Sequence, residues 1–202
     1  MCEAMGAEIT AVVVDDGETS LAECLDSLRR QSVNLRIIVA AGPKTNLDVA
    51  EYYADRVLEP TVGIGRARVK GILAAKTPYV LSCDSDAVYS PRYAEYALRN
   101  LEAGVACVKA GTILPRELSP LGALEAAFSP LVPYEFSLAF SREAFLEAKV
   151  HEWDYSDPRS DIGIPVALTL TPLPEPAMIV YARLPTRGWT YQLERALGWR
   201  QA

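Results

Sequence analysis

Runs of apolar, largely β-branched residues recur along the first half of the chain, each followed by a polar break and a stretch with helical spacing. The runs that predict buried strands are residues 9–14, 35–40, 57–59, 79–83 and 105–108. Between them, apolar residues recur every three or four positions, which predicts helices after residues 20, 45, 65 and 90. This alternation is typical of a parallel sheet covered by helices on both faces. We therefore expect an α/β fold with the 79–83 strand near its centre.

Two helix starts and one helix end carry local signals. Ser20, followed three residues later by Glu23, has the spacing of a capping box. Ser90 precedes Pro91, which predicts a helix with Ser90 as its N-cap and the proline at its first position. Gly104 suits the position just after the end of the same helix.

The pattern is less regular in the second half. Prolines interrupt residues 113–133, which predicts a loop-rich excursion. Beyond it the sequence favours a strand at 136–140, a helix at 141–148, a surface loop at 151–161, a helix at 164–170 and a last strand at 177–181. With no linker or repeat in view, we expect one domain over residues 1–202.

Composition narrows the classes of function. Half of the 202 residues are hydrophobic, enough for a substantial core, and the net charge of −6 disfavours nonspecific nucleic-acid binding. The cysteines show no metal-site spacing, and those at positions 24, 83 and 107 lie in apolar patterns and are expected to be buried thiols. The N-terminal residues resemble no signal peptide and no apolar run has the length of a membrane span, so we expect a cytoplasmic protein.

Two carboxylates follow the central predicted strand. Asp84 and Asp86 are two residues apart, so in an extended chain their side chains point the same way. Paired carboxylates at a strand end suit a hard cation such as Mg²⁺ or Mn²⁺, which would leave coordination positions open for phosphate. The alternative is a turn in which both side chains cap backbone N–H groups.

The segment around these carboxylates resembles a known family. The sequence GIGRARVKGI from residue 63, then PYVL from residue 78, the D-x-D and a later S-P are similar to the core of family 2 glycosyltransferases of the GT-A fold. This resemblance implies a metal-dependent, inverting transfer of a sugar from a nucleotide-diphosphate donor to a hydroxyl acceptor. It also implies a nucleotide-binding half over about residues 8–112 and an acceptor-side half over about 113–202.

The resemblance assigns roles to individual residues. Asp86 would be the direct metal ligand, and Asp84 would reach the ribose or a metal-bound water. Arg68 falls where the family carries an arginine that contacts the nucleotide. The alternative for Arg68 is a solvated helix face shared with Arg66 and Lys70.

Asp161 is the candidate general base. It aligns with the acidic residue that takes the acceptor's proton in the family, although Ser160, Gly163 and Ala167 replace the neighbouring residues of that motif. An N-cap aspartate is the alternative. His151, in the same region, is either a third metal ligand or an ordinary loop histidine.

In the family, an aspartate after the second strand usually recognises the nucleotide base, but here Ala40 and Ala41 stand at that place. Asp15 or Asp16, after the first strand, would have to supply that hydrogen bond. These departures leave open a binding protein that kept the fold and lost turnover. A nucleotidyltransferase fits less well, because the loop after the first strand lacks a basic residue.

The C-terminal tail from residue 187 combines arginines with Trp189, Tyr191 and Trp199. This composition suits peripheral contact with a membrane surface, and packing of the tail on the sheet explains it equally well.

Overall fold

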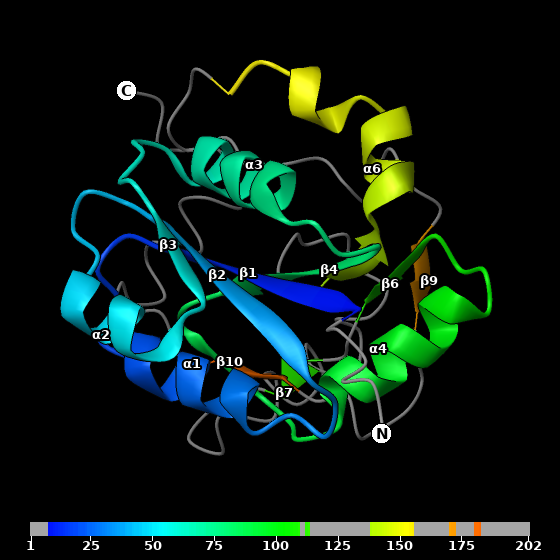
Figure 1. Ribbon diagram of the computed structural model, residues 1–202, viewed down its shortest axis with the longest axis horizontal. Helices are drawn as coiled ribbons and strands as arrows, with labels where there is room; N and C mark the ends of the chain where they lie inside the picture. Colours follow the sequence, from blue (N-terminus) through cyan, green and yellow to red (C-terminus); the bar gives the residue numbers. More distant parts are fainter. Residues whose placement is uncertain (1–7, 110–111, 114–137, 156–169, 173–179, 183–202) are drawn as a thin grey trace, which may run out of the picture.

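A computed structural model describes residues 8–109, 112–113, 138–155, 170–172 and 180–182 of the chain. Its main sheet has the order β3-β2-β1-β4-β8-β6-β9 (Figure 1). These strands are β1 (Ile9–Asp15), β2 (Leu35–Ala41), β3 (Arg56–Leu58), β4 (Tyr79–Asp84), β6 (Cys107–Lys109), β8 (Leu138–Ser141) and β9 (Leu170–Pro172). A second sheet contains β5 (Ala87–Tyr89), β10 (Val180–Ala182) and β7 (Thr112–Ile113), in the order β5-β10-β7.

The first four strands of the main sheet are parallel, and β4 lies at its centre, as the apolar runs predict. The α/β fold with a mainly parallel core is thus confirmed. β8 is the exception, since it runs antiparallel to both β4 and β6. The sequence pattern predicted a strand there but carried no signal for its direction.

Helices cover both faces of the main sheet (Figure 1). They are α1 (Leu21–Arg29), α2 (Leu47–Tyr53), α3 (Ile64–Ala74), α4 (Tyr93–Glu102) and α6 (Arg142–Glu147), with a short 3₁₀ helix η2 (Val150–Glu152). The apolar side chains of α1, α2 and α4 share one core cluster, and those of α3 and α6 share another. β1 supplies both clusters because its side chains alternate, Ala11 and Val13 on one face and Val12 and Val14 on the other. This explains why the strand reads as a continuous apolar run.

α3 packs closely on the sheet through a glycine. A Cβ added to Gly71 would collide with the Val12 side chain and crowd Ala40. Glycine is therefore required here, and its contact fixes how near α3 lies to β1 and β2.

The local helix signals are only partly confirmed. Gly104 has φ +92° and follows the C-cap of α4, as expected. The start of that helix was predicted wrongly, because α4 begins at Tyr93 with Arg92 as its N-cap. The preceding segment is held elsewhere, since the carbonyl of Pro91 accepts a hydrogen bond from the backbone N–H of Ser32 at 2.7 Å.

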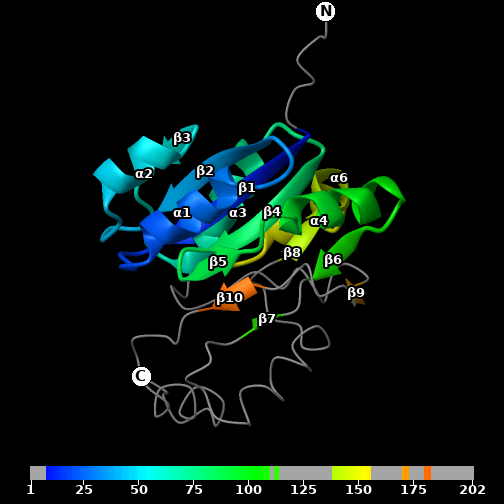
Figure 2. The same ribbon diagram turned by 90° about the horizontal axis from the view of Figure 1, so that it is seen from below.

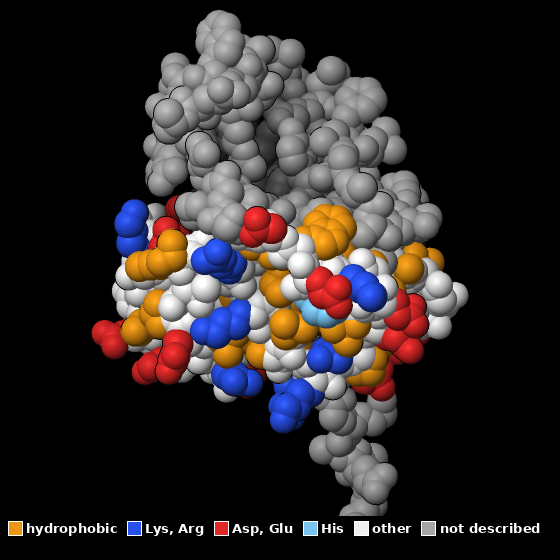
Figure 3. All heavy atoms as spheres, turned by 90° about the horizontal axis from the view of Figure 1, so that it is seen from above, with side chains coloured by type: hydrophobic (Ala, Val, Ile, Leu, Met, Phe, Trp, Pro, Cys, Tyr) orange, Lys and Arg blue, Asp and Glu red, His pale blue; other side chains and the backbone are white. Residues whose placement is uncertain are grey.

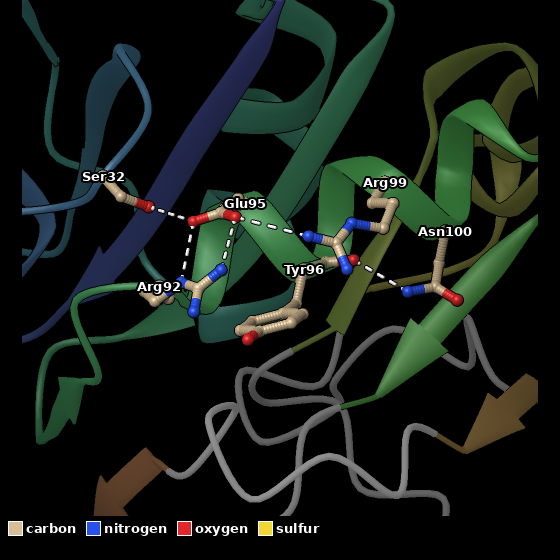
Figure 4. A network of polar contacts seen from close by, with 6 residues as sticks. All are labelled: Ser32, Arg92, Glu95, Tyr96, Arg99 and Asn100. Carbon is tan, nitrogen blue, oxygen red and sulfur yellow. Dashed lines mark hydrogen bonds and ion pairs between the residues drawn. The ribbon is translucent and has the colours of Figure 1, made fainter.

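The outer surface of α4 carries a polar network (Figure 4). Glu95 accepts hydrogen bonds from Arg92 at 2.7 and 3.0 Å and from the Ser32 hydroxyl at 2.9 Å. These bonds, from Arg92 first and then from Ser32, lower the pKa of Glu95 to about 2. Arg92 and Arg99 both lie over the Tyr96 ring. The network therefore ties α4 to the segment that follows α1.

The described residues of the second half agree with most predictions. β8 and α6 lie where a strand and a helix were expected, and β10 overlaps the last predicted strand. Leu170 begins strand β9, so it does not end a helix as predicted. The 151–161 loop is also not wholly a surface loop, because Tyr155 is buried and its hydroxyl donates to the Val150 carbonyl at 2.7 Å. The 114–133 excursion, residues 164–169 and the tail lie outside the described residues.

Within the described part of the chain, no helix combines the length and apolar character needed to cross a membrane. The thiols of Cys24, Cys83 and Cys107 are free and buried, as the sequence predicted.

Candidate active site

The D-x-D segment forms the tight connection between β4 and β5. β4 ends at Asp84, Ser85 and Asp86 make the turn, and β5 then joins the second sheet beside β10 (Figure 2). Because β1, β2 and β4 are parallel, the turn lies at the edge where the β1 and β2 strands also end. Ligands of open α/β sheets bind at this edge.

A buried arginine lies next to the first carboxylate. Arg68, on α3, is only 1% exposed, and its guanidinium contacts the Asp84 carboxylate at 2.6 Å and the Ser82 hydroxyl at 2.9 Å. The solvated helix face is thus the wrong interpretation for Arg68, although it holds for its exposed neighbours Arg66 and Lys70. The ion pair with the Arg68 guanidinium fixes the orientation of the Asp84 carboxylate.

Asp86 has the opposite environment. Burial raises its pKa to about 7, and the negative charges of Asp84 and Glu18 add to the rise. A hydrogen bond to the backbone of Asp86 itself and, to a smaller extent, the charge of Arg68 lower this pKa only in part. A cation bound here would remove the repulsion between these carboxylates, so the electrostatics of the turn fit a divalent ion.

The side chains of the turn are of the kind that hold the expected metal. Asp84 and Asp86 are oxygen ligands of the kind that Mg²⁺ and Mn²⁺ prefer. Among the described residues, no group of three or more histidine, cysteine, aspartate or glutamate side chains is placed to hold a metal ion. His151 therefore does not complete this site; it lies beside Phe145 and Glu152. The two aspartates would leave most coordination positions to water and phosphate, which is how Mg²⁺ is usually bound.

The two aspartates after β1 differ in their surroundings. Asp15 is 1% exposed, and its two carboxylate oxygens accept hydrogen bonds from the backbone N–H groups of Gly17 at 3.0 Å and Glu18 at 3.1 Å. It therefore shapes the loop that leads into α1. Asp16 is exposed and accepts from the Lys44 N–H at 3.3 Å. Of the two, Asp16 is the one open to a ligand.

The end of β2 offers no polar side chain that could recognise a nucleotide base. Ala40 and Ala41 are fully buried, and the Gly42 N–H that follows is bonded to the Asp15 carbonyl at 2.6 Å. The structure thus brings Arg68, Asp84 and Asp86 together and places the β1–α1 loop nearby through Glu18. Asp161 lies outside the described residues.

Sequence reasoning missed several residues that support the turn. They are Ser20, Cys24, Ser82 and Tyr89, each hydrogen-bonded to the D-x-D backbone or to Arg68. Alternation alone would have placed Ser82 on the same strand face as Asp84. The other three are brought to the turn by tertiary packing, for which the sequence carries no local signal.

Comparison with known proteins identifies the family. A family model described as Glycosyl transferase family 2 matches residues 10–119, over half of the chain. The chain belongs to glycosyl transferase family 2. The match includes the D-x-D turn and Arg68. Among curated proteins, this family 2 chain is similar to the putative glycosyltransferase EpsH of Bacillus subtilis, with 35% identity over 97 residues, which are 44% of this chain and 28% of EpsH.

Solved structures confirm the GT-A type of fold. The mannosyltransferase PcManGT from Pyrobaculum calidifontis, in complex with GDP-Man and Mn²⁺, has a TM-score of 0.70 at 19% identity, with coverage of 94% of this chain and 61% of that one. S. aureus TarS 1-349 in complex with UDP has a TM-score of 0.67 at 15% identity, with coverage of 88% and 60%. This chain therefore spans less than two thirds of the length of each of these relatives.

Proposed function

We propose that this family 2 chain binds a nucleotide-diphosphate sugar together with Mg²⁺ or Mn²⁺ and transfers the sugar to a hydroxyl acceptor. The observation that carries the proposal is the asymmetry of the D-x-D turn. Arg68 neutralises Asp84, while Asp86 faces an excess of negative charge. A site of this kind is stabilised by a bound cation, which can at the same time coordinate phosphate oxygens. PcManGT, which shares the fold, is described in complex with GDP-Man and Mn²⁺.

The roles of the residues follow from this asymmetry. Asp86 would hold the cation directly, and Asp84, fixed by Arg68, would bind the ribose or a cation-bound water. The cation would supply positive charge against the diphosphate that leaves with the nucleotide. Asp16, exposed at the same edge, is the better placed of the two β1 aspartates for a polar contact with the nucleotide.

For the acceptor side, we propose that Asp161 takes the proton of the attacking hydroxyl. The proposal rests on the family resemblance of the segment around residue 161. A single in-line displacement at the anomeric carbon would invert its configuration.

Titration calorimetry with UDP and GDP, each with and without Mn²⁺, tests donor binding. Binding of at least one nucleotide should require Mn²⁺ and should be lost in Asp86→Asn. A screen of UDP- and GDP-sugars for transfer or hydrolysis then separates an enzyme from a binding protein of the same fold. Mn²⁺-dependent binding without any turnover would favour the binding protein, and absence of binding by the wild type would refute the proposed site.

A further inference from the structure

Two side chains at the N-terminal end of α1, those of its N-cap Ser20 and of Cys24, bind the backbone of the D-x-D turn. The Ser20 hydroxyl donates to the carbonyl of Ser85 at 3.1 Å, and the Cys24 thiol donates to the carbonyl of Asp84 at 3.4 Å. Ser20 is 4% exposed and Cys24 is fully buried, so water does not compete for either contact. The carbonyls of Asp84 and Ser85 thus point at the N-terminal end of α1.

The backbone N–H groups of Asp84 and Ser85 are bonded as well. The N–H of Asp84 donates to the Tyr89 hydroxyl, and the N–H of Ser85 donates to the Val14 carbonyl, both at 3.2 Å. Four consecutive backbone polar groups, from the N–H of Asp84 to the carbonyl of Ser85, therefore have partners. These bonds hold the two peptide planes on either side of Ser85, which connect Asp84 to Asp86.

Ser20 stands at the N-cap of α1, yet its hydroxyl makes no capping hydrogen bond. The predicted capping box with Glu23 is therefore not formed. An N-cap serine normally stabilises its helix by binding a backbone N–H in the first turn. Here the same hydroxyl is directed to the turn that bears the metal-binding carboxylates.

We infer that Ser20 is a positioning residue for the metal site, which acts through the Ser85 carbonyl to set the relative orientation of Asp84 and Asp86. The inference rests on the proposed role of these two aspartates in cation binding. Groups that orient metal ligands typically change metal affinity by about 10- to 100-fold when they are removed. Cys24 supports the adjacent carbonyl more weakly, because a thiol is a poor donor.

The test compares Ser20→Ala with a matched control, Thr10→Val. The Thr10 hydroxyl is also buried, and it is hydrogen-bonded to the Thr77 hydroxyl at 2.7 Å. Thr10 lies near the start of β1, where Tyr79 and Val80 of β4 are its neighbours, whereas the D-x-D turn follows the other end of β4. Its loss should lower stability without changing the turn.

For each variant, the free Mn²⁺ signal in electron paramagnetic resonance gives the Mn²⁺ dissociation constant, with saturating UDP or GDP present. A thermal melt gives the stability of the same sample. Ser20→Ala should weaken Mn²⁺ binding by about 10-fold, while Thr10→Val should leave it unchanged despite a lower melting temperature. Ser20→Gly, which lacks the hydroxyl but is tolerated at an N-cap, should behave like Ser20→Ala.

Mn²⁺ affinities of the two Ser20 variants within about twofold of the wild type, well below the loss typical for such groups, would overturn the inference. An equal loss in Thr10→Val would also overturn it, since the effect would then reflect general destabilisation. Both results leave the proposed function standing. If the wild type itself binds no Mn²⁺ with either nucleotide, the proposed metal site fails first.

Discussion

Asp84 and Asp86 are two residues apart, yet their replacement by asparagine should change stability in opposite directions. Asp84 pairs with the buried guanidinium of Arg68, so its charge stabilises the fold. Asp86 is repelled by Asp84 and Glu18 in a partly buried position, so its charge destabilises the fold when no cation is present. The turn therefore contains one carboxylate that the folded state requires and one that it tolerates.

The magnitude for Asp86 follows from its pKa, which rises from an ordinary value of 3.8 to about 7. A rise of this size corresponds to at most about 4 kcal/mol, because each pKa unit is worth about 1.4 kcal/mol. Partial exposure to water reduces it, and we expect Asp86→Asn to stabilise the fold by about 1–3 kcal/mol at pH 8.

The sign depends on pH in a defined way. The folded state holds the Asp86 proton up to about pH 7, whereas the unfolded state releases it near 3.8. The wild type therefore loses stability relative to Asp86→Asn as the pH rises between these values. The advantage of the variant should be complete above pH 7 and should shrink as the pH falls toward 4.

For Asp84, the reference is the cost of removing one partner from a buried ion pair, about 3–5 kcal/mol. Asp84 is 31% exposed and asparagine keeps an acceptor oxygen for Arg68, so a smaller loss of about 1–3 kcal/mol is expected for Asp84→Asn. Asp16→Asn is the matched control. The Asp16 carboxylate lies at the same edge, and its contact with the Lys44 N–H survives the change.

Urea unfolding at pH 8 in the presence of EDTA, followed by circular dichroism, measures these differences. Asp86→Asn should raise the free energy of unfolding, Asp84→Asn should lower it, and Asp16→Asn should leave it nearly unchanged. A loss of stability in both D-x-D variants would refute the reasoning, since it would mean that both carboxylates serve mainly to cap the turn.

Three further outcomes are expected. Asp161→Asn should keep the Mn²⁺-dependent affinity for the donor and lower turnover by at least about 100-fold; unchanged turnover would place the base elsewhere. Gly71→Ala should lower the free energy of unfolding in urea by about 1–3 kcal/mol, because the new methyl group meets the Val12 side chain. Gly104→Ala should lower it by less, because a methyl group there has open space and only the φ of +92° opposes it. Glu95→Gln should lower the free energy of unfolding at neutral pH, because Arg92 and Ser32 hold the pKa of Glu95 at about 2 in the folded state alone. The difference from the wild type should disappear as the pH falls from about 4.5 toward 2. A difference that persists at low pH would show that packing, and not charge, is lost.

The sequence alone determined the layered fold and the location of the D-x-D turn. Strands buried on both faces must be apolar along their whole length, and helices on a sheet must repeat their apolar residues every three or four positions. β1, β2, β4 and the helices between them follow these rules, so their order and type were predicted from local pattern. The carboxylates at the end of β4 were found for the same reason, since a strand end is visible in the sequence.

Tertiary structure decided what each polar residue of the site does. The sequence placed Arg68 beside two other basic residues, and only the packing of α3 on the sheet turned it inward onto Asp84. Likewise, Ser20 has the local pattern of a helix cap, and its contact with Ser85 arises from a residue 65 positions away. Hydrogen bonds and charges act over a few ångströms in space, whereas sequence patterns report only neighbours along the chain. The partners of a buried polar group are therefore fixed only when the helices and strands have packed together.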